Sequence, residues 1–283
     1  MIKLILSDMD ETLISYGMSR ISPRTIAAIH ACQAEGLVFG PATGRNPLEV
    51  ADFLCNDARC YQTGIMVNGQ QVFLEGRLVR EVAIDAALLA RLADRLRGRR
   101  GCALLTYRAD GVAEWFGSSR KELEPIIDNA TRQGDRRVDA PVDHPAIKVG
   151  IIANIAREEE LTLRQELVEA FPEPDFPNTV PTWFDVVPHG LSKADGIEIL
   201  QHEMGIGNDE ICVFGDAPND LEMFARVHHS CAVANATPEA AAAARWHVGA
   251  ASEDGVAIAL EQIAEAARQT RLTGIEVVPA FMR

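Results

Sequence analysis

Short apolar runs alternate with longer amphipathic stretches in the first and last thirds of the chain. The short runs predict strands that are buried on both faces, as in a parallel sheet. They are 3–7, 37–40, 64–67, 210–214, 230–234 and 246–249. The amphipathic stretches between them predict helices, and they are 22–35, 47–55, 190–203, 218–225, 238–245 and 253–269. This alternation predicts an α/β fold with a doubly wound, Rossmann-like parallel sheet.

The middle third of the chain has a different pattern. Residues 84–99 predict a helix with four leucines along one face, and a mixture of strands and helices follows. The expected strands are 102–107, 112–116, 146–152 and 178–187, and the expected helices are 118–130 and 157–170. Such a mixture is typical of an α+β unit with an antiparallel sheet. We therefore expect a core formed by 1–82 and 186–283, interrupted by an inserted domain at 83–185.

Composition narrows the classes of protein that fit this pattern. The 283 residues are 47% hydrophobic and 24% charged, which is ordinary for a globular protein. A net charge of -14 argues against nucleic acid as the main partner, and no apolar run is long enough to span a membrane. The first predicted strand begins at the N-terminus, so we expect no signal peptide and a cytoplasmic protein.

Six cysteines are scattered along the chain without a CxxC pair. This spacing favours buried thiols in a reducing compartment and does not predict a zinc site. The histidines likewise lack HxxxH or HxH spacing.

Polar clusters follow several of the predicted core strands. Asp8 and Asp10 follow the first strand, Thr43 follows the second, and Asp216 begins the cluster after 210–214, which also holds Asn219 and Asp220. Each cluster alone is typical of a turn or a helix cap. Lys193 stands at the start of a predicted helix, where the helix dipole favours an acid. Since the carboxyl ends of parallel strands meet at one edge of a sheet, we expect these side chains to form a single site.

The chemistry that suits this set is phosphoryl transfer through an aspartyl-phosphate. Asp8 and Asp216 can hold Mg²⁺, and Asp220 can bond a metal-bound water, because Mg²⁺ prefers oxygen ligands. Lys193 supplies a positive charge for the phosphate dianion. Asp10 is placed to protonate the leaving oxygen and later to activate water.

Two further residues are expected to contact the phosphate. Thr43 and its neighbouring backbone N–H groups can bind the phosphoryl oxygens, and Gly44 belongs to that turn. Asn219 can position either the phosphate or Lys193.

The order of these motifs resembles that of the haloacid dehalogenase-like hydrolases. Four short motifs are similar in sequence to those of the Cof-type phosphatases within this family. They are Asp8–Thr12, Asn68–Gly69, Gly190–Lys193 and Gly215–Asp220. The resemblance covers about 1–82 and 186–270. It implies Mg²⁺-dependent hydrolysis of phosphate esters, and it implies that the inserted domain is a cap that closes over the site.

The resemblance also implies roles for individual residues. Asp8 is the implied nucleophile and Asp10 the acid/base, and Asp10 is expected to reach the metal through its backbone carbonyl. Thr43 and Lys193 are implied phosphate ligands, and Asp216 is the implied metal ligand.

Several positions are less determined. Glu11 stands where the family most often has glycine, which indicates a different backbone geometry or loop charge. Arg45 is expected either to contact the substrate or to form a surface ion pair. Asn68 is expected either to face the substrate or to form only a turn, and the tail 271–283 carries no assignable motif.

The leading hypothesis is a phosphoric monoester hydrolase that acts on a small phosphorylated metabolite, with a sugar phosphate as the expected substrate. One alternative is a sugar phosphomutase of the phosphomannomutase type, which would transfer the phosphoryl group to a labelled hexose phosphate with little release of free phosphate. A second alternative is a non-catalytic binding protein on the same scaffold. The sequence predicts no oligomeric state.

Overall fold

The computed structural model describes residues 1–131, 134–177 and 181–283. The chain divides into two compact units, one formed by Met1–Arg80 with Ser192–Arg283 and the other by Glu81–Leu191. The first unit is thus built from the two ends of the chain, and the second is continuous. The catalytic and specificity roles expected for the two predicted domains stay predictions.

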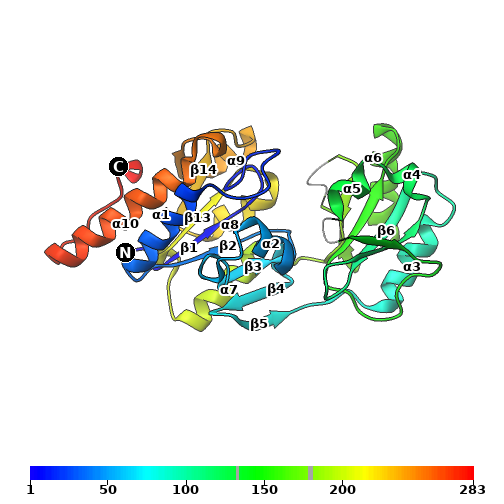
Figure 1. The fold of residues 1–283 in the computed structure, drawn as a ribbon, viewed down its shortest axis with the longest axis horizontal. Helices are drawn as coiled ribbons and strands as arrows, with labels where there is room; N and C mark the ends of the chain where they lie inside the picture. Colours follow the sequence, from blue (N-terminus) through cyan, green and yellow to red (C-terminus); the bar gives the residue numbers. More distant parts are fainter. Residues whose placement is uncertain (132–133, 178–180) are drawn as a thin grey trace. The chain divides into compact units, whose positions relative to one another are not determined.

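A five-stranded parallel sheet forms the centre of the first unit (Figure 1). Its spatial order is β15 (Trp246–Val248), β14 (His229–Val233), β13 (Ile211–Gly215), β1 (Leu4–Ser7) and β2 (Val38–Pro41), and each neighbouring pair is parallel. The strand order reverses between β1 and β13, since β2 lies on one side of β1 and β13 on the other. In open α/β sheets, ligands bind at such a reversal, beyond the carboxyl ends of the strands. The predicted α/β fold class is confirmed.

Helices cover both faces of this sheet. On one face, α1 (Pro23–Ala34) and α10 (Gly255–Thr273) lie side by side (Figure 1), and the Cys32 thiol donates to the Leu260 carbonyl oxygen at 3.3 Å. On the other face, α7 (Lys193–Met204) and α8 (Leu221–Arg226) share an apolar cluster with alternate residues of β1 and β13. This cluster includes Leu4, Leu6, Ile197, Leu200, Val213, Met223 and Phe224. The shorter helices of this unit are α2 (Pro47–Phe53) and α9 (Pro238–Ala243).

A three-stranded sheet extends the first unit beside the main sheet, and it contains the hairpin that the sequence predicts from 71–75 and 77–81. It consists of the antiparallel strands β3 (Gly64–Met66), β4 (Gln71–Leu74) and β5 (Arg77–Glu81). Glu75 and Gly76 form the tight turn between β4 and β5, and both have positive φ. A parallel bridge between Ala42 and Ile65 places β3 next to the end of β2.

The second unit has its own five-stranded sheet. Its spatial order is β11 (Trp183–Asp185), β9 (Val149–Ala153), β6 (Cys102–Tyr107), β7 (Ala113–Gly117) and β8 (Asp135–Arg137). All neighbours are antiparallel except β7 and β8. A short pair, β10 (Pro174–Asp175) with β12 (Val187–Pro188), lies outside this sheet.

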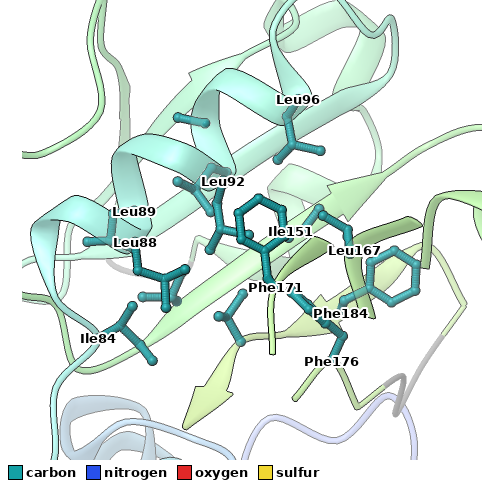
Figure 2. Packing of buried hydrophobic residues seen from close by; sticks show 14 of the residues in the cluster. Ile84, Leu88, Leu89, Leu92, Leu96, Ile151, Leu167, Phe171, Phe176 and Phe184 are labelled. Carbon is teal, nitrogen blue, oxygen red and sulfur yellow. The ribbon is translucent and has the colours of Figure 1, made fainter. Parts of the chain in front are cut away.

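Alternate residues of the second sheet enter different apolar clusters, because successive side chains of a strand point to opposite faces. On one face, the leucines of α3 (Ala86–Leu96) point toward Ile151, Phe171 and Phe184, as Figure 2 shows. α6 (Arg157–Ala170) contributes Leu163 and Leu167 to the same cluster. On the other face, α4 (Arg120–Leu123) and α5 (Ile126–Ala130) cover Leu105 and Trp115.

The structure and the predicted elements differ in three places. The helix predicted over 118–130 is broken into α4 and α5, because Pro125 has no N–H to donate and Glu124 before it is extended at ψ 145°. β8 lies in a charged segment, Asp135–Arg137, that carries no apolar alternation and was not predicted. Of the strand predicted over 178–187, residues 178–180 lie outside the described residues, and the rest contains β11 and β12.

Among the residues described, no helix is both long and apolar enough to cross a bilayer. Five of the six cysteines are buried, Cys55 is half-buried, and all six are free thiols.

Candidate active site

Asp8 stands where β1 ends, next to the reversal of strand order. Its backbone N–H donates to the Phe214 carbonyl oxygen at 2.9 Å, which ties the end of β1 to the end of β13. The residue is only 6% exposed, and its Oδ1 accepts a hydrogen bond from Lys193 Nζ at 2.6 Å. The predicted nucleophile and the predicted phosphate ligand are therefore in direct contact.

Lys193 is the first residue of α7 and is almost completely buried. The helix begins here because the Ser192 hydroxyl accepts from the Ala194 N–H and the Asp195 carboxylate accepts from the Ser192 N–H. The Lys193 ammonium donates to Asp8 at 2.6 Å and to Asp220 at 2.7 Å. These two carboxylates offset the unfavourable position of a cation at a helix N-terminus.

The pKa of Lys193 follows from the same contacts. Burial by itself lowers this pKa, but the charges of Asp220 and Asp8 and their hydrogen bonds outweigh burial and hold the pKa above its usual value. Lys193 is therefore charged at neutral pH.

Asp216 and Asp220 come from the segment that follows β13. The Asp220 side chain accepts from the backbone N–H groups of Asp216 at 2.9 Å and Ala217 at 3.2 Å, which folds this segment into a tight turn. A Cβ on Gly215 would lie 2.6 Å from the Asp220 carboxyl group, so the turn requires glycine there. Asp216 in turn accepts a hydrogen bond from the Thr12 hydroxyl at 2.7 Å.

Three carboxylates thus converge around one ammonium. Asp8, Asp216 and Asp220 each offer an oxygen, and these oxygens lie within 4.8 Å of one another. Burial raises the pKa of Asp216 to about 6, although the Thr12 hydroxyl opposes the shift. Burial also raises the pKa of Asp8 well above its usual range, because Lys193 is shared with Asp220 and does not fully offset burial and the neighbouring carboxylates. The set is electrostatically incomplete without a further cation.

The end of β2 forms the other side of the site. The Thr43 N–H donates to the Ile65 carbonyl oxygen at 2.8 Å, and the Arg45 N–H donates to the Thr43 hydroxyl at 3.2 Å. These two amides are therefore engaged within the loop, and the expected contact of the neighbouring backbone N–H groups with phosphoryl oxygens stays a prediction. The buried Thr43 hydroxyl keeps its own proton to donate.

Asn68 lies beside this loop. Its N–H donates to the Thr43 carbonyl oxygen at 3.0 Å, and its backbone is left-handed at φ 53°. A Cβ on Gly44 would lie 3.1 Å from the Asn68 carboxamide, which places the two residues against each other. The structure therefore brings Thr43, Gly44 and Asn68 together, while their contact with a substrate stays a prediction.

Arg45 pairs with Asp10. Its Nε and terminal nitrogen donate to the two Asp10 carboxylate oxygens at 2.7 and 2.6 Å, and its guanidinium stacks on the Phe53 ring at 4.0 Å. The Glu49 carboxylate is 3.9 Å away. The Asp10 side chain is 54% exposed and points toward Arg45, whereas Asp8, Asp216 and Asp220 supply the converging oxygens. Of the two roles expected for Arg45, the structure shows an ion pair, with Asp10 as the partner, while a contact of Arg45 with the substrate stays a prediction.

Other contacts of the site were missed. Thr12 belongs to the first motif, but its hydrogen bond to Asp216 had no signal besides its place there. Glu11 has φ 57°, which explains why glycine suits that position, and the Asn235 side chain donates to its carbonyl oxygen at 2.7 Å. Asn219 lies half-buried in the one-turn helix η4 (Pro218–Asp220). Its predicted role stays untested.

Comparison with known proteins agrees with this arrangement. A family model described as haloacid dehalogenase-like hydrolase matches residues 5–260. The 5-amino-6-(5-phospho-D-ribitylamino)uracil phosphatase YbjI of Escherichia coli is 25% identical, over 93% of this chain and 96% of its own. An HMP-PP phosphatase of Yersinia pseudotuberculosis is 26% identical, over 84% of this chain and 86% of its own.

The fold recurs in solved structures as well. A haloacid dehalogenase-like hydrolase from Bacteroides thetaiotaomicron superposes with a TM-score of 0.80 at 22% identity, covering 93% of this chain and all of that one. The predicted class of enzyme, a phosphoric monoester hydrolase, agrees with the names of the two relatives. The family expected from the motifs is confirmed: this chain belongs to the haloacid dehalogenase-like hydrolases.

Proposed function

We propose that this protein is a Mg²⁺-dependent phosphatase that hydrolyses a small phosphorylated metabolite through an aspartyl-phosphate on Asp8. The observation that carries the proposal is the contact of the buried Asp8 with Lys193, inside a group of three converging carboxylates. A lone buried carboxylate would repel a phosphate dianion. A carboxylate beside a shared ammonium and a divalent cation would not repel the dianion, because its charge is neutralised.

The donor set supports Mg²⁺ as the cation. Asp8, Asp216 and Asp220 offer carboxylate oxygens within 4.8 Å of one another, and hard oxygen ligands are those that Mg²⁺ prefers. We infer that Asp8 and Asp216 hold the ion, that Asp220 bonds to its water, and that Asp10 adds its backbone carbonyl. When bound, the ion neutralises charge on the carboxylates and on the phosphate.

The residues of the chain then divide the chemistry among them. An oxygen of Asp8 forms a bond to phosphorus while the ester P–O bond breaks, and Asp10 gives its proton to the leaving oxygen. Lys193 and the Thr43 hydroxyl stabilise charge on the phosphoryl oxygens. In the second half, Asp10 takes a proton from water, the water oxygen bonds to phosphorus, and the bond to Asp8 breaks.

The pair between Arg45 and Asp10 sets a condition on this cycle. An Asp10 carboxylate that accepts from both arms of the Arg45 fork is an acceptor only. To donate a proton, Asp10 must be protonated and its hydroxyl must turn away from Arg45. We propose that a substrate phosphate or hydroxyl competes for Arg45 and frees Asp10 at the moment of reaction.

The substrate class is proposed from the relatives. The named substrate of the Escherichia coli relative carries its phosphate on a ribityl chain. A phosphorylated sugar or sugar alcohol, free or attached to a ring, is the class we propose for this chain.

The experiment is phosphate release from p-nitrophenyl phosphate and from a panel of sugar, sugar-alcohol and nucleotide phosphates, with Mg²⁺ and with EDTA. We expect release only with Mg²⁺, with the sugar and sugar-alcohol phosphates as the best substrates. The control is Asp8→Asn, which keeps the size of the side chain and removes the nucleophile. Full Mg²⁺-dependent turnover by this variant would exclude Asp8 as the nucleophile, and no release from any compound would overturn the proposed phosphatase.

A further inference from the structure

A second group of ligand-type side chains lies away from the carboxylates of the candidate active site. His30 on α1, Asp57, and Cys60 at the end of the one-turn helix η1 (Ala58–Cys60) place one donor atom each within 4.8 Å of the others. His30 Nε2 lies 2.7 Å from Asp57 Oδ2 and 4.0 Å from Cys60 Sγ. The Cys60 thiol is buried, while the His30 and Asp57 side chains are 28% and 20% exposed.

The geometry is that of a converging site and differs from that of a proton relay. In a nucleophile–base–acid relay, the cysteine and the carboxylate contact different nitrogens of the imidazole ring. Here the same nitrogen, Nε2, faces both Asp57 and Cys60. Three donor atoms that face one another across a few ångströms can instead share a single ion.

The distances suit a tetrahedral ion after small movements. Zinc lies about 2.0–2.1 Å from a histidine nitrogen, about 2.0–2.2 Å from a carboxylate oxygen and about 2.3 Å from a thiolate, so neighbouring ligand atoms are about 3.3–3.6 Å apart. The distance between His30 and Asp57, 2.7 Å, must lengthen, and that between His30 and Cys60, 4.0 Å, must shorten. Each change is well under 1 Å.

The backbone around the cluster is already ordered by hydrogen bonds. The Asp57 carbonyl oxygen accepts from the Cys60 N–H at 2.8 Å, and the Gln33 side chain donates to the Arg59 carbonyl oxygen at 2.6 Å. Arg59 donates to both Asp57 oxygens, but its side chain is 61% exposed and can turn away from an arriving ion. Burial raises the pKa of the Cys60 thiol to about 12, so an ion that binds there must displace the thiol proton.

We propose that His30, Asp57 and Cys60 form a Zn²⁺ site that joins α1 to the segment leading into β3. A thiolate and a carboxylate neutralise the charge of the ion, and the mixed nitrogen, sulfur and oxygen set suits Zn²⁺ better than Mg²⁺. Motif spacing did not predict this site, because His30 is 27 residues from Asp57 and only the packing of α1 on η1 brings them together. The ion would fix the segment between α2 and β3 on α1, and it would leave the carboxylate cluster at Asp8 untouched.

The test uses Co²⁺ as a spectroscopic substitute for Zn²⁺ on the full-length chain, with excess Mg²⁺ present to occupy the carboxylate cluster. A cobalt ion bound to a thiolate gives a sulfur-to-metal charge-transfer band in the near ultraviolet, which an all-oxygen site cannot give. We expect one equivalent of Co²⁺ to produce the band and one equivalent of Zn²⁺ to abolish it. Since the band does not depend on turnover, its absence would not bear on the proposed phosphatase.

The variants assign the ligands. Cys60→Ser is expected to remove the band, and His30→Gln, at a partly exposed position, is expected to weaken Co²⁺ binding at least tenfold. Cys55→Ser is the matched control, because Cys55 lies in the same segment outside the trio and should leave the band unchanged. If Cys60→Ser does not fold, the His30 variant still decides the matter. No band in the native chain, or unchanged binding in His30→Gln, would overturn the proposal.

Discussion

Replacing Asp216 by asparagine should stabilise the metal-free protein while removing its activity. The native side chain is one of three carboxylates that crowd around Lys193, and burial holds the pKa of Asp216 at about 6 instead of the ordinary 3.8. Asparagine keeps an oxygen that can accept the hydrogen bond from Thr12, and it removes the charge. The variant should therefore lose the cost of burying a charge near Asp220 and keep the packing of the side chain.

The magnitude follows from the pKa of Asp216. A tenfold change in proton affinity is worth about 1.4 kcal/mol, so the ionised Asp216 costs the folded state up to about 3 kcal/mol. Some of this is screened because the site is partly open to solvent. We expect Asp216→Asn to raise the free energy of unfolding by about 1–3 kcal/mol at pH 8 in EDTA.

The pH dependence fixes the sign of the effect. Because the folded-state pKa of Asp216 lies above its unfolded value, the folded state binds the proton more tightly, and the native protein loses stability as pH rises from about 4 to about 6. The advantage of the variant should be full above that window, shrink within it and vanish below it. Urea denaturation at pH 8, 6 and 4.5 in EDTA measures this directly.

Two further observations complete this prediction. Adding Mg²⁺ should stabilise the native protein at pH 8 but not Asp216→Asn, and the variant should release no phosphate. Asp143→Asn is the charge-matched control, because Asp143 is fully exposed and its substitution should change stability at none of the three pH values. If Asp216→Asn is no more stable than the native protein at pH 8, or is equally stabilised at pH 4.5, then the buried charge of Asp216 does not destabilise the folded protein as inferred.

Substitutions at three other residues test the remaining contacts. Lys193→Met should abolish turnover and lower the free energy of unfolding by about 3–5 kcal/mol at pH 8 in EDTA, since it leaves buried carboxylates without their cation. Urea denaturation should show a loss that shrinks as the pH falls, because burial raises the pKa of Asp8 and a protonated Asp8 no longer needs the cation. Arg45→Lys should lower kcat/KM by roughly tenfold or more, because lysine cannot make the fork to both Asp10 oxygens; an unchanged kcat/KM would remove Arg45 from the mechanism. Glu11→Gly should change the free energy of unfolding by less than about 1 kcal/mol, because the relief of backbone strain at φ 57° is offset by the greater conformational freedom of glycine in the unfolded chain. In the same denaturation assay, Glu11→Val should lower the free energy of unfolding more than Glu11→Gly does, because a β-branched residue is strained at positive φ.

Much of the first unit could be predicted from the sequence because the central strands of its parallel sheet are fully buried. Leu4–Ser7 and Ile211–Gly215 are apolar runs, which predict buried strands. The polar groups that follow them lie at one edge of the sheet, because the carboxyl ends of parallel strands meet there. The second unit was harder. β8 consists of Asp135, Arg136 and Arg137, and this edge strand, which pairs with β7 at the end of its sheet, carries no hydrophobic signal.

The candidate site was predictable as a set of residues and less so as a set of contacts. The motifs identify Lys193 and Asp220 as site residues. That the Lys193 ammonium is shared between Asp8 and Asp220 depends on how α7 packs against the sheet. The pair between Arg45 and Asp10 joins side chains 35 residues apart. The periodicity of a single strand or helix does not predict a contact between residues so far apart in the sequence. Tertiary packing decides whether such residues meet.

The contact between Asp8 and Lys193 also constrains the order in which the chain can fold during synthesis. The two residues are 185 positions apart, and the whole of the second unit is translated between them. That unit is continuous, so it can complete its own apolar core while β1 and β2 still lack β13 as a neighbour. Asp8 therefore leaves the ribosome long before its counter-charge exists, and the parallel sheet closes only when the last third of the chain arrives.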